Sequence, residues 1–131
     1  MRKIIVLLII LILIPVKVSA FELFKINSNW SKKDICLQAT YSALHIFDWA
    51  QTKRLVKDGR EELNPILGKK PSQNKIDAYM GITLAGHLFI SNILPTKWRG
   101  INPRRIWQYF SIGIESTVVA HNYSIGVRLK F

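Results

Sequence analysis

The chain has 131 residues, which is room for one domain, because a second independent core rarely forms below about 150 residues. Its formal net charge of +11 suits a nucleic acid, an anionic lipid surface or the loops of a membrane protein. The sequence carries no DNA- or RNA-binding motif and its N-terminus indicates export, so we predict no nucleic-acid partner.

Residues 1–20 have the three parts of a secretory signal peptide. Arg2 and Lys3 form a positive start, residues 4–14 form an unbroken apolar run, and residues 18–20 (Val-Ser-Ala) form a small-residue cleavage pattern. The apolar run is short for a spanning helix, which needs about 20 residues. We therefore predict Sec-type export, with cleavage after Ala20 favoured over an uncleaved signal anchor.

Three helices are predicted downstream of this segment. The first covers about residues 35–56 and follows Asp34, which is placed to cap it. The second covers about residues 73–94 and is stopped by Pro95, and the third covers about residues 104–121. The expected fold class is all-α: an N-terminal signal or signal-anchor segment, then a single helical membrane domain over residues 21–131, built as a three-helix membrane bundle with a C-terminal extended tail.

The second predicted helix is the best candidate for a membrane span. Its segment 76–94 has 19 residues with one charged side chain, Asp77, and is apolar nearly all round. At 1.5 Å per residue this segment is about 28 Å long, close to the thickness of the hydrocarbon layer. Basic residues are concentrated between positions 53 and 75, which favours the bacterial inner membrane with that loop in the cytoplasm. A bundle in the periplasm is the competing prediction.

The connection over residues 60–74 is rich in turn-forming residues. Asn64-Pro65 and Lys70-Pro71 both restrict the residue before the proline, so this loop is stiff for its length. A stiff loop can place Glu62 and Asn64 near the helix ends, either as a binding edge or as caps. Capping is the favoured role.

The C-terminal tail, residues 122–131, alternates apolar and polar side chains and ends in Phe131. This period of two is typical of a strand, and a terminal aromatic is an assembly signal in outer-membrane proteins. The rest of the chain lacks the repeated alternating segments that such proteins contain. An outer-membrane-associated protein is therefore a minor alternative, and an extended tail at the membrane surface is favoured.

Polar side chains interrupt each predicted helix at helical spacing, so that each helix carries one polar stripe. A carboxylate in an apolar bundle needs a partner, so we expect the stripes to face one another, with histidines or Gln51 beside Asp48 and Glu115. The stripes also contain Thr52, Tyr79, Thr83, Gln108 and Ser111. The candidate polar cluster comprises His45, Asp48, Gln51, Glu62, Asn64, His87, Glu115, His121 and Asn122.

Two interpretations of this cluster remain open. Carboxylates and histidines together can bind a divalent metal or relay protons. The same groups can instead form interhelical hydrogen bonds that define the packing of the bundle. The sequence contains no metal-ligand spacing, no nucleophile motif and no phosphate-binding glycine loop, so structural packing is favoured and no cofactor is predicted.

Several short motifs are distributed over most of the mature chain: DWAQT at 48–52, ELNPILG at 62–68 with Pro71, Tyr79, Glu115, VAHN at 119–122, and Gly126. On these motifs the chain resembles a group of short uncharacterised bacterial and phage-borne membrane proteins. The resemblance implies an exported, helical architecture and implies no activity. The positions that match the pattern are Asp48, Gln51, Glu62, Asn64, Pro65, Glu115 and Asn122.

We therefore expect a small integral membrane protein that acts by interaction in the cell envelope, as an accessory subunit or, in a phage, in envelope modification or exclusion. Its expected partners are membrane lipid and a protein, which includes a second copy of the chain. The alternative is a membrane enzyme or a metal- or proton-handling protein that uses Asp48, Glu115 and the histidines. An enzyme is the less favoured of the two.

Overall fold

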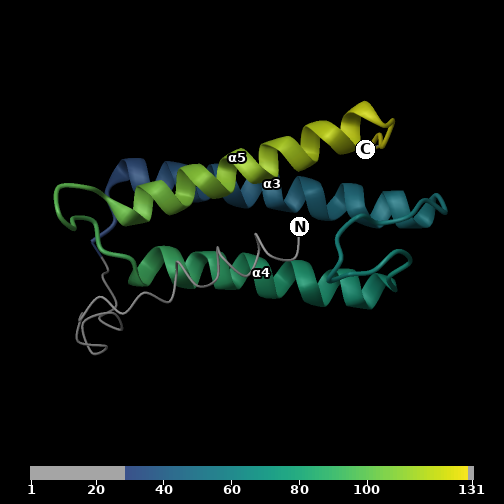
Figure 1. The fold of residues 1–131 in the computed structure, drawn as a ribbon, viewed down its shortest axis with the longest axis horizontal. Helices are drawn as coiled ribbons and strands as arrows, with labels where there is room; N and C mark the ends of the chain where they lie inside the picture. The colour runs from purple at the N-terminus through teal and green to yellow at the C-terminus, as the bar shows by residue number, and fades with distance from the viewer. Residues whose placement is uncertain (1–28, 130–131) are drawn as a thin grey trace, which may run out of the picture.

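The computed structural model describes residues 29–129, and this part of the chain is all-α (Figure 1). It contains three helices: α3 (Lys32–Lys57), α4 (Gln73–Ile93) and α5 (Pro103–Ser124). The prediction of an all-α chain with three helices is thereby confirmed over these residues. The export segment at residues 1–20 and the terminal Phe131 lie outside the described range.

Helix α3 begins at a complete capping box. The side chain of Ser31 accepts a hydrogen bond from the Asp34 backbone N–H (3.1 Å), and the Asp34 carboxylate accepts one from the Ser31 backbone N–H (3.0 Å). The cap is therefore Ser31, not Asp34 as the sequence analysis expected, and the helix starts three residues earlier than predicted. Asp34 acts as the third helical residue of the box, where a carboxylate satisfies a free backbone donor.

Helix α5 extends to Ser124, three residues beyond its predicted end, and stops there in a Schellman motif. The Val127 backbone N–H donates to the Asn122 carbonyl, the Gly126 N–H donates to the Tyr123 carbonyl, and Gly126 has a left-handed φ of 89°. Residues 122–124 are therefore helical, and the predicted strand-like alternation over residues 122–131 is not realised in the described residues. The extended tail shortens to residues 127–129, where Val127 is buried.

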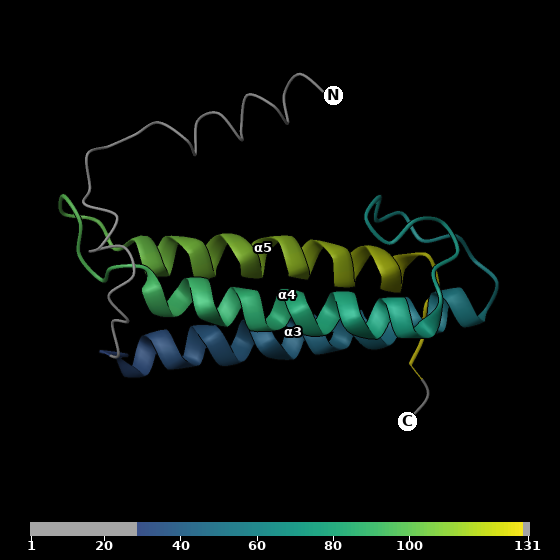
Figure 2. The ribbon, with the colours of Figure 1, turned by 90° about the horizontal axis from the view of Figure 1, so that it is seen from below.

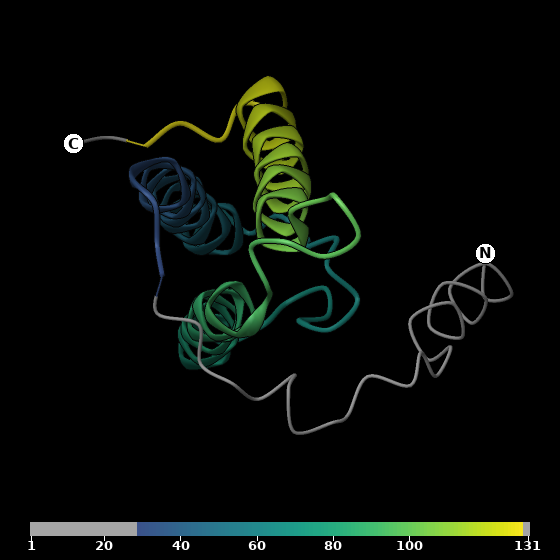
Figure 3. The same cartoon turned by 90° about the vertical axis from the view of Figure 1, so that its left-hand side faces the viewer.

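The three helices run alongside one another and, seen end on, occupy three corners of a triangle (Figures 2 and 3). Helix α3 packs against both neighbours, most extensively against α5, whereas α4 and α5 barely touch. The ends of α4 are set by a Ser72 cap at one side and by Leu94 before Pro95 at the other. Because α4 and α5 both pack on α3 but make little contact with each other, a space is left between them that α3 borders on one side.

The loop between α3 and α4 folds back over the bundle and supplies Leu67 to a small apolar core with Ile76 and Met80. Glu62 accepts a hydrogen bond from the Asn64 backbone N–H (2.8 Å), and Asn64 Oδ1 accepts one from the Ile66 N–H (3.0 Å). Both side chains therefore stabilise turns inside the loop, and the expectation that they cap helix ends is wrong.

The distribution of side chains across the bundle is inverted relative to a water-soluble globular domain. Buried polar and charged side chains outnumber buried apolar ones, and large apolar side chains such as Ile46, Phe89 and Phe110 are exposed on all three helices. No helix in residues 29–129 combines the length and apolar content that crossing a membrane requires. The predicted span over residues 76–94 is therefore not supported, because polar residues such as Asp77, Thr83 and His87 interrupt that segment.

Candidate functional site

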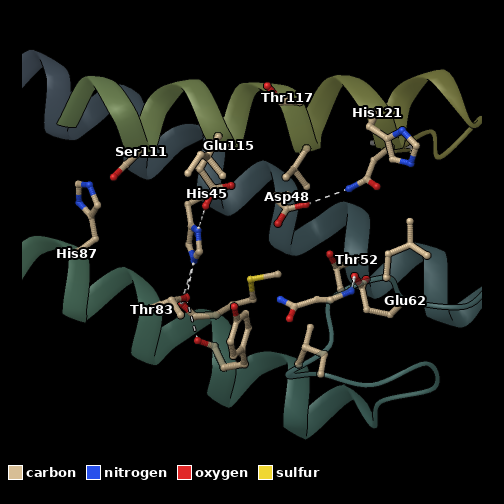
Figure 4. A pocket seen from close by; sticks show the side chains of 18 of the residues that line it. His45, Asp48, Thr52, Glu62, Thr83, His87, Ser111, Glu115, Thr117 and His121 are labelled. Carbon is tan, nitrogen blue, oxygen red and sulfur yellow. Dashed lines mark hydrogen bonds and ion pairs between the residues drawn. The ribbon is translucent and has the colours of Figure 1, made fainter. Parts of the chain in front are cut away.

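A cavity of about 1080 Å³ lies between α4 and α5, with α3 as its floor and the loop after α3 at one end. We call it the α4–α5 groove. It follows from the packing described above: α3 holds the other two helices apart, so α4 and α5 are in contact at few positions, among them the stacked rings of His87 and Trp107. Apolar residues such as Met80, Ile90 and Ile114 form much of its wall, and the polar stripes of the three helices face into it (Figure 4).

Most of the predicted cluster lines this groove. His45, Asp48, Glu62, Asn64, His87, Glu115, His121 and Asn122 are all part of its wall. Gln51 is not: it is buried between α3 and α5, where its side-chain amide donates to the Val119 carbonyl (3.4 Å). Helical spacing placed Gln51 beside the stripe, and the rotation of α3 against α5 turned it away from the groove.

The shortest side-chain contact in the groove joins His45 to Glu115, with 2.7 Å between Nδ1 and Oε1. The other ring nitrogen of His45, Nε2, is 3.0 Å from the Met80 carbonyl, which can only accept a hydrogen bond. Burial by itself lowers the pKa of His45, but the hydrogen bond to Glu115 and the nearby carboxylates outweigh it and raise the pKa. A doubly protonated imidazole paired with a carboxylate satisfies both nitrogens.

Asp48 lies one helical turn from His45 but is not paired with a histidine. Its only side-chain hydrogen bond among the described contacts comes from Asn122 Nδ2, at 3.0 Å. Burial raises the pKa of Asp48 to about 7, and the charges of Glu115 and Glu62 add to this effect. Asp48 is therefore a carboxyl group that changes its protonation near neutral pH while facing the groove.

Three aromatic rings, one from each helix, close one end of the groove. The His87 ring stacks on the Tyr41 ring, with 3.5 Å between centroids, and on the Trp107 ring, at 5.1 Å. Burial lowers the pKa of His87 to about 4, and the positive His45 adds to the shift. His87 is thus an uncharged imidazole at neutral pH. Tyr41 and Trp107 were not among the predicted site residues, although Trp107, Ser111 and Glu115 follow a helical spacing of four that places them on one face.

A second polar cluster lies outside the groove, where α3 and α5 begin and α4 ends. Arg104 is fully buried; its Nε donates to the Ser91 carbonyl (2.7 Å), and its guanidinium lies over the Trp30 ring. Asp34 receives a hydrogen bond from Arg105 (2.8 Å), and Gln108 donates to the Asp34 carbonyl (3.0 Å). We call Asp34, Arg104, Arg105 and Gln108 the arginine cluster. The sequence analysis did not predict this cluster: it expected Asp34 as a helix cap and Arg104 at the start of the third helix, and gave neither a buried partner.

The row Thr83, His45 and Glu115 has the order hydroxyl, imidazole, carboxylate that hydrolases use (Figure 4). Two contacts make it unsuited to that chemistry. His45 Nε2 must carry a proton because it faces the Met80 carbonyl, and the Thr83 hydroxyl bonds to the Tyr79 carbonyl of its own helix (2.9 Å). The imidazole therefore has no free position to accept a proton from Thr83.

Within residues 29–129, no three His, Cys, Asp or Glu side chains are arranged to hold a metal ion. Comparison of the chain with family models, with curated proteins and with solved structures found no match. The groove and its side chains are consequently the basis on which a function can be argued.

Proposed function

We propose that this chain is a small membrane-associated protein of the bacterial cell envelope that acts by binding, and that the α4–α5 groove holds an amphiphilic molecule of the membrane. The observation that carries the proposal is the groove itself: a cavity of about 1080 Å³ with apolar side walls and polar groups gathered on its floor and at one end. This volume lies at the upper end of the range for small-molecule sites, about 300–1,000 Å³. A ligand with a long apolar part and a polar group at one end is complementary to this combination of apolar and polar lining.

The exposed surface supports a position at a membrane. Large apolar side chains on all three helices, such as Ile46, Leu88 and Phe110, are half exposed or more. Contiguous exposed apolar surface marks a site of contact with lipid or protein. The net charge of +11 favours an anionic lipid surface, and the export signal in residues 1–20 would bring the chain there.

A variant whose new side chain fills the groove tests the binding function directly. Gly86 lines the groove, and nothing lies within 4 Å of a Cβ built on it, so Gly86→Phe places a ring in the cavity. Gly113 on α5 also has open space where a Cβ would lie, with no atom within 4 Å, and it is outside the α4–α5 groove. Gly113→Phe is therefore a matched control with the same change in helix propensity.

The measurement is the lipid that co-purifies with the full chain, identified by native mass spectrometry after mild detergent extraction. We expect a bound amphiphile in the wild type and in Gly113→Phe, and at least a tenfold lower occupancy in Gly86→Phe. Equal occupancy in the two glycine variants would remove the groove as the binding site. Release of the wild-type chain from membranes by an alkaline wash would count against an integral position, and a chain that never sediments with membranes would refute membrane association.

Proton handling is a second candidate, favoured by one observation: Asp48 faces the groove with a pKa of about 7. A carboxyl group that titrates near neutral pH can exchange a proton with a ligand or with solvent. Amphiphile binding that changes with pH between 6 and 8 in the wild type, and does not change in Asp48→Asn, would support this candidate. A pH-independent wild type would eliminate it.

A further inference from the structure

The groove ends in hydrogen-bond donors that have no acceptor. His87 Nε2 and Trp107 Nε1 are both buried, both belong to residues that line the groove, and neither has a partner. The His87 side chain is only 4 % exposed. An unpaired buried donor destabilises a fold by about 1–3 kcal/mol, so two of them at one place point to a group that arrives from outside the chain.

The state of His87 follows from its surroundings. The Gln38 side-chain amide nitrogen lies 3.2 Å from His87 Nδ1, and with the amide in this orientation it donates and Nδ1 accepts. Because burial keeps the ring uncharged, its single proton is on Nε2. Indole Nε1 of Trp107 is always a donor. Both free groups are therefore N–H donors, and the stacking of the two rings holds them together at the same end of the groove.

The charge of the groove limits what these donors can receive. Asp48, Glu61, Glu62 and Glu115 line the groove, whereas no Lys or Arg among the described residues does. Glu115 Oε2 is also buried without a partner, one helical turn from Ser111, which faces His87 (Figure 4). An anionic headgroup would meet these carboxylates, and the positive His45 is already paired with Glu115. An uncharged acceptor oxygen has no such penalty, and a neighbouring hydroxyl on the ligand can donate to Glu115.

We infer that His87 and Trp107 form a carbonyl-recognition subsite, and that the ligand of the groove is an uncharged acyl ester of a polyol, such as an acylglycerol. The ester carbonyl accepts from the two N–H groups, a free hydroxyl of the headgroup donates to Glu115, and the acyl chain lies along the apolar walls of α4 and α5. This inference rests on the proposed binding function and specifies the ligand class for the same groove.

Three probes separate the features of such a ligand: 1-monopalmitoylglycerol, its ether analogue 1-O-hexadecylglycerol, which lacks only the carbonyl, and palmitate, which is charged. Binding to the detergent-solubilised full chain is measured by titration calorimetry. We expect the wild type to bind the ester about five- to tenfold more tightly than the ether, which is the effect of a hydrogen bond or two to a neutral acceptor. Palmitate is expected to bind more weakly than the ester above pH 7.

Trp107→Phe tests the donor itself, because phenylalanine keeps the stacked ring and removes the N–H. We expect this variant and His87→Phe each to lose part of the preference for the ester, because one donor remains, with the ether affinity unchanged. His121→Phe, at the opposite end of the groove, is the matched control and should retain the preference for the ester. A preference that is undiminished in both Trp107→Phe and His87→Phe would overturn the subsite.

A readout on the wild type avoids any dependence on how the variants fold. The indole N–H resonance of Trp107, assigned by its loss in Trp107→Phe, should shift when the ester is added and stay in place with the ether. Equal binding of ester and ether by the wild type, with no difference in that resonance, would overturn the inference and leave the proposed function standing. No binding of any probe would overturn both.

Discussion

Asp34 and Asp48 are two buried carboxylates on the same helix with opposite surroundings. Asp34 lies in the arginine cluster: burial raises its pKa, but hydrogen bonds from Arg105 and Ser31 outweigh burial, and the net pKa is lowered. Asp48 has one amide partner and two neighbouring carboxylates, and its pKa is raised to about 7. Burial therefore does not decide the charge of a carboxyl group; the partners supplied by the other helices do.

The comparison separates an end of the bundle at which the buried charged groups are paired from a groove at which several buried polar atoms are not. In the arginine cluster the unpaired atom is the uncharged amide oxygen of Gln108. In the arginine cluster each buried charge has a partner, and the cluster joins α3, α4 and α5 at one end. In the groove, donors and acceptors on His87, Trp107 and Glu115 are unpaired. Strongly shifted, incompletely paired groups gather at functional sites. We therefore assign the arginine cluster a structural role and propose that a ligand binds in the groove.

The largest effect is expected from Arg104→Met. The change removes a fully buried cation, leaves the Ser91 carbonyl without its side-chain donor and takes one of two guanidinium groups from beside Asp34, which keeps its hydrogen bonds from Arg105 and Ser31. This lowers the free energy of unfolding by about 3–5 kcal/mol. Urea denaturation of the detergent-solubilised chain measures it. A midpoint equal to the wild type would show that this cluster does not anchor the bundle.

Asp48→Asn is expected to stabilise the fold at high pH. Because the pKa of Asp48 is raised from 3.8 to about 7, its contribution is fully favourable below 3.8 and is lost as the pH rises through 7. The amide is never charged, so the variant should gain about 4 kcal/mol over the wild type at pH 8 and very little at pH 4. Thermal unfolding at the two pH values checks this. A variant that is less stable than the wild type at pH 8 would contradict it.

Asp34→Asn is expected to lower the stability of the fold, the opposite of the effect of Asp48→Asn. The lowered pKa of Asp34 means that its carboxylate stabilises the fold above pH 3.8, and that this stability is lost as the pH falls through the folded-state pKa. Removing the charge weakens the hydrogen bonds from Arg105 and Ser31 and should lower the stability at pH 7 by about 2 kcal/mol. The same unfolding series provides the value. If Asp34→Asn and Asp48→Asn changed the stability in the same direction, the contrast between the arginine cluster and the groove would be removed.

The smallest effect is expected from Glu115→Gln. The change removes the carboxylate that raises the pKa of His45, so the titration midpoint of His45 should fall. The pKa of Asp48 should fall as well, because Glu115 also raises it. Proton NMR of the His45 ring across pH 4–9 follows the first shift. A His45 midpoint that does not move would show that the pair is not coupled.

Much of this arrangement could be predicted from helical periodicity. The stripe of His45, Asp48 and Thr52 lies on the inner face of α3, as their spacing indicates. The pairing of the stripes could not be predicted: histidines were expected beside both carboxylates, but Asp48 meets Asn122. Which residue of α5 lies beside Asp48 depends on the position of α5 along the axis of α3, and local sequence patterns do not predict that position.

The sequence analysis missed two features of α5: the way the helix ends and the burial of Arg104. The alternation after residue 121 suggested a strand, yet Gly126 with the apolar Val127 after it is also the signature of a helix C-terminus, and that signal was overlooked. Arg104 follows the helix-starting Pro103, and the sequence analysis gave it no buried partner. Its burial depends on carbonyls of α4 that are free because that helix ends beside it.

The amino-acid sequence by itself determined where the helices form and which side of each is polar, because propensity, capping and the 3.6-residue period act within a few residues. Only the tertiary structure decided that α4 and α5 stand apart on α3, that Arg104 is enclosed while Asp48 lies open to a groove, and that His87 stacks between Tyr41 and Trp107. The reason is that each of these outcomes depends on the relative rotation and shift of whole helices.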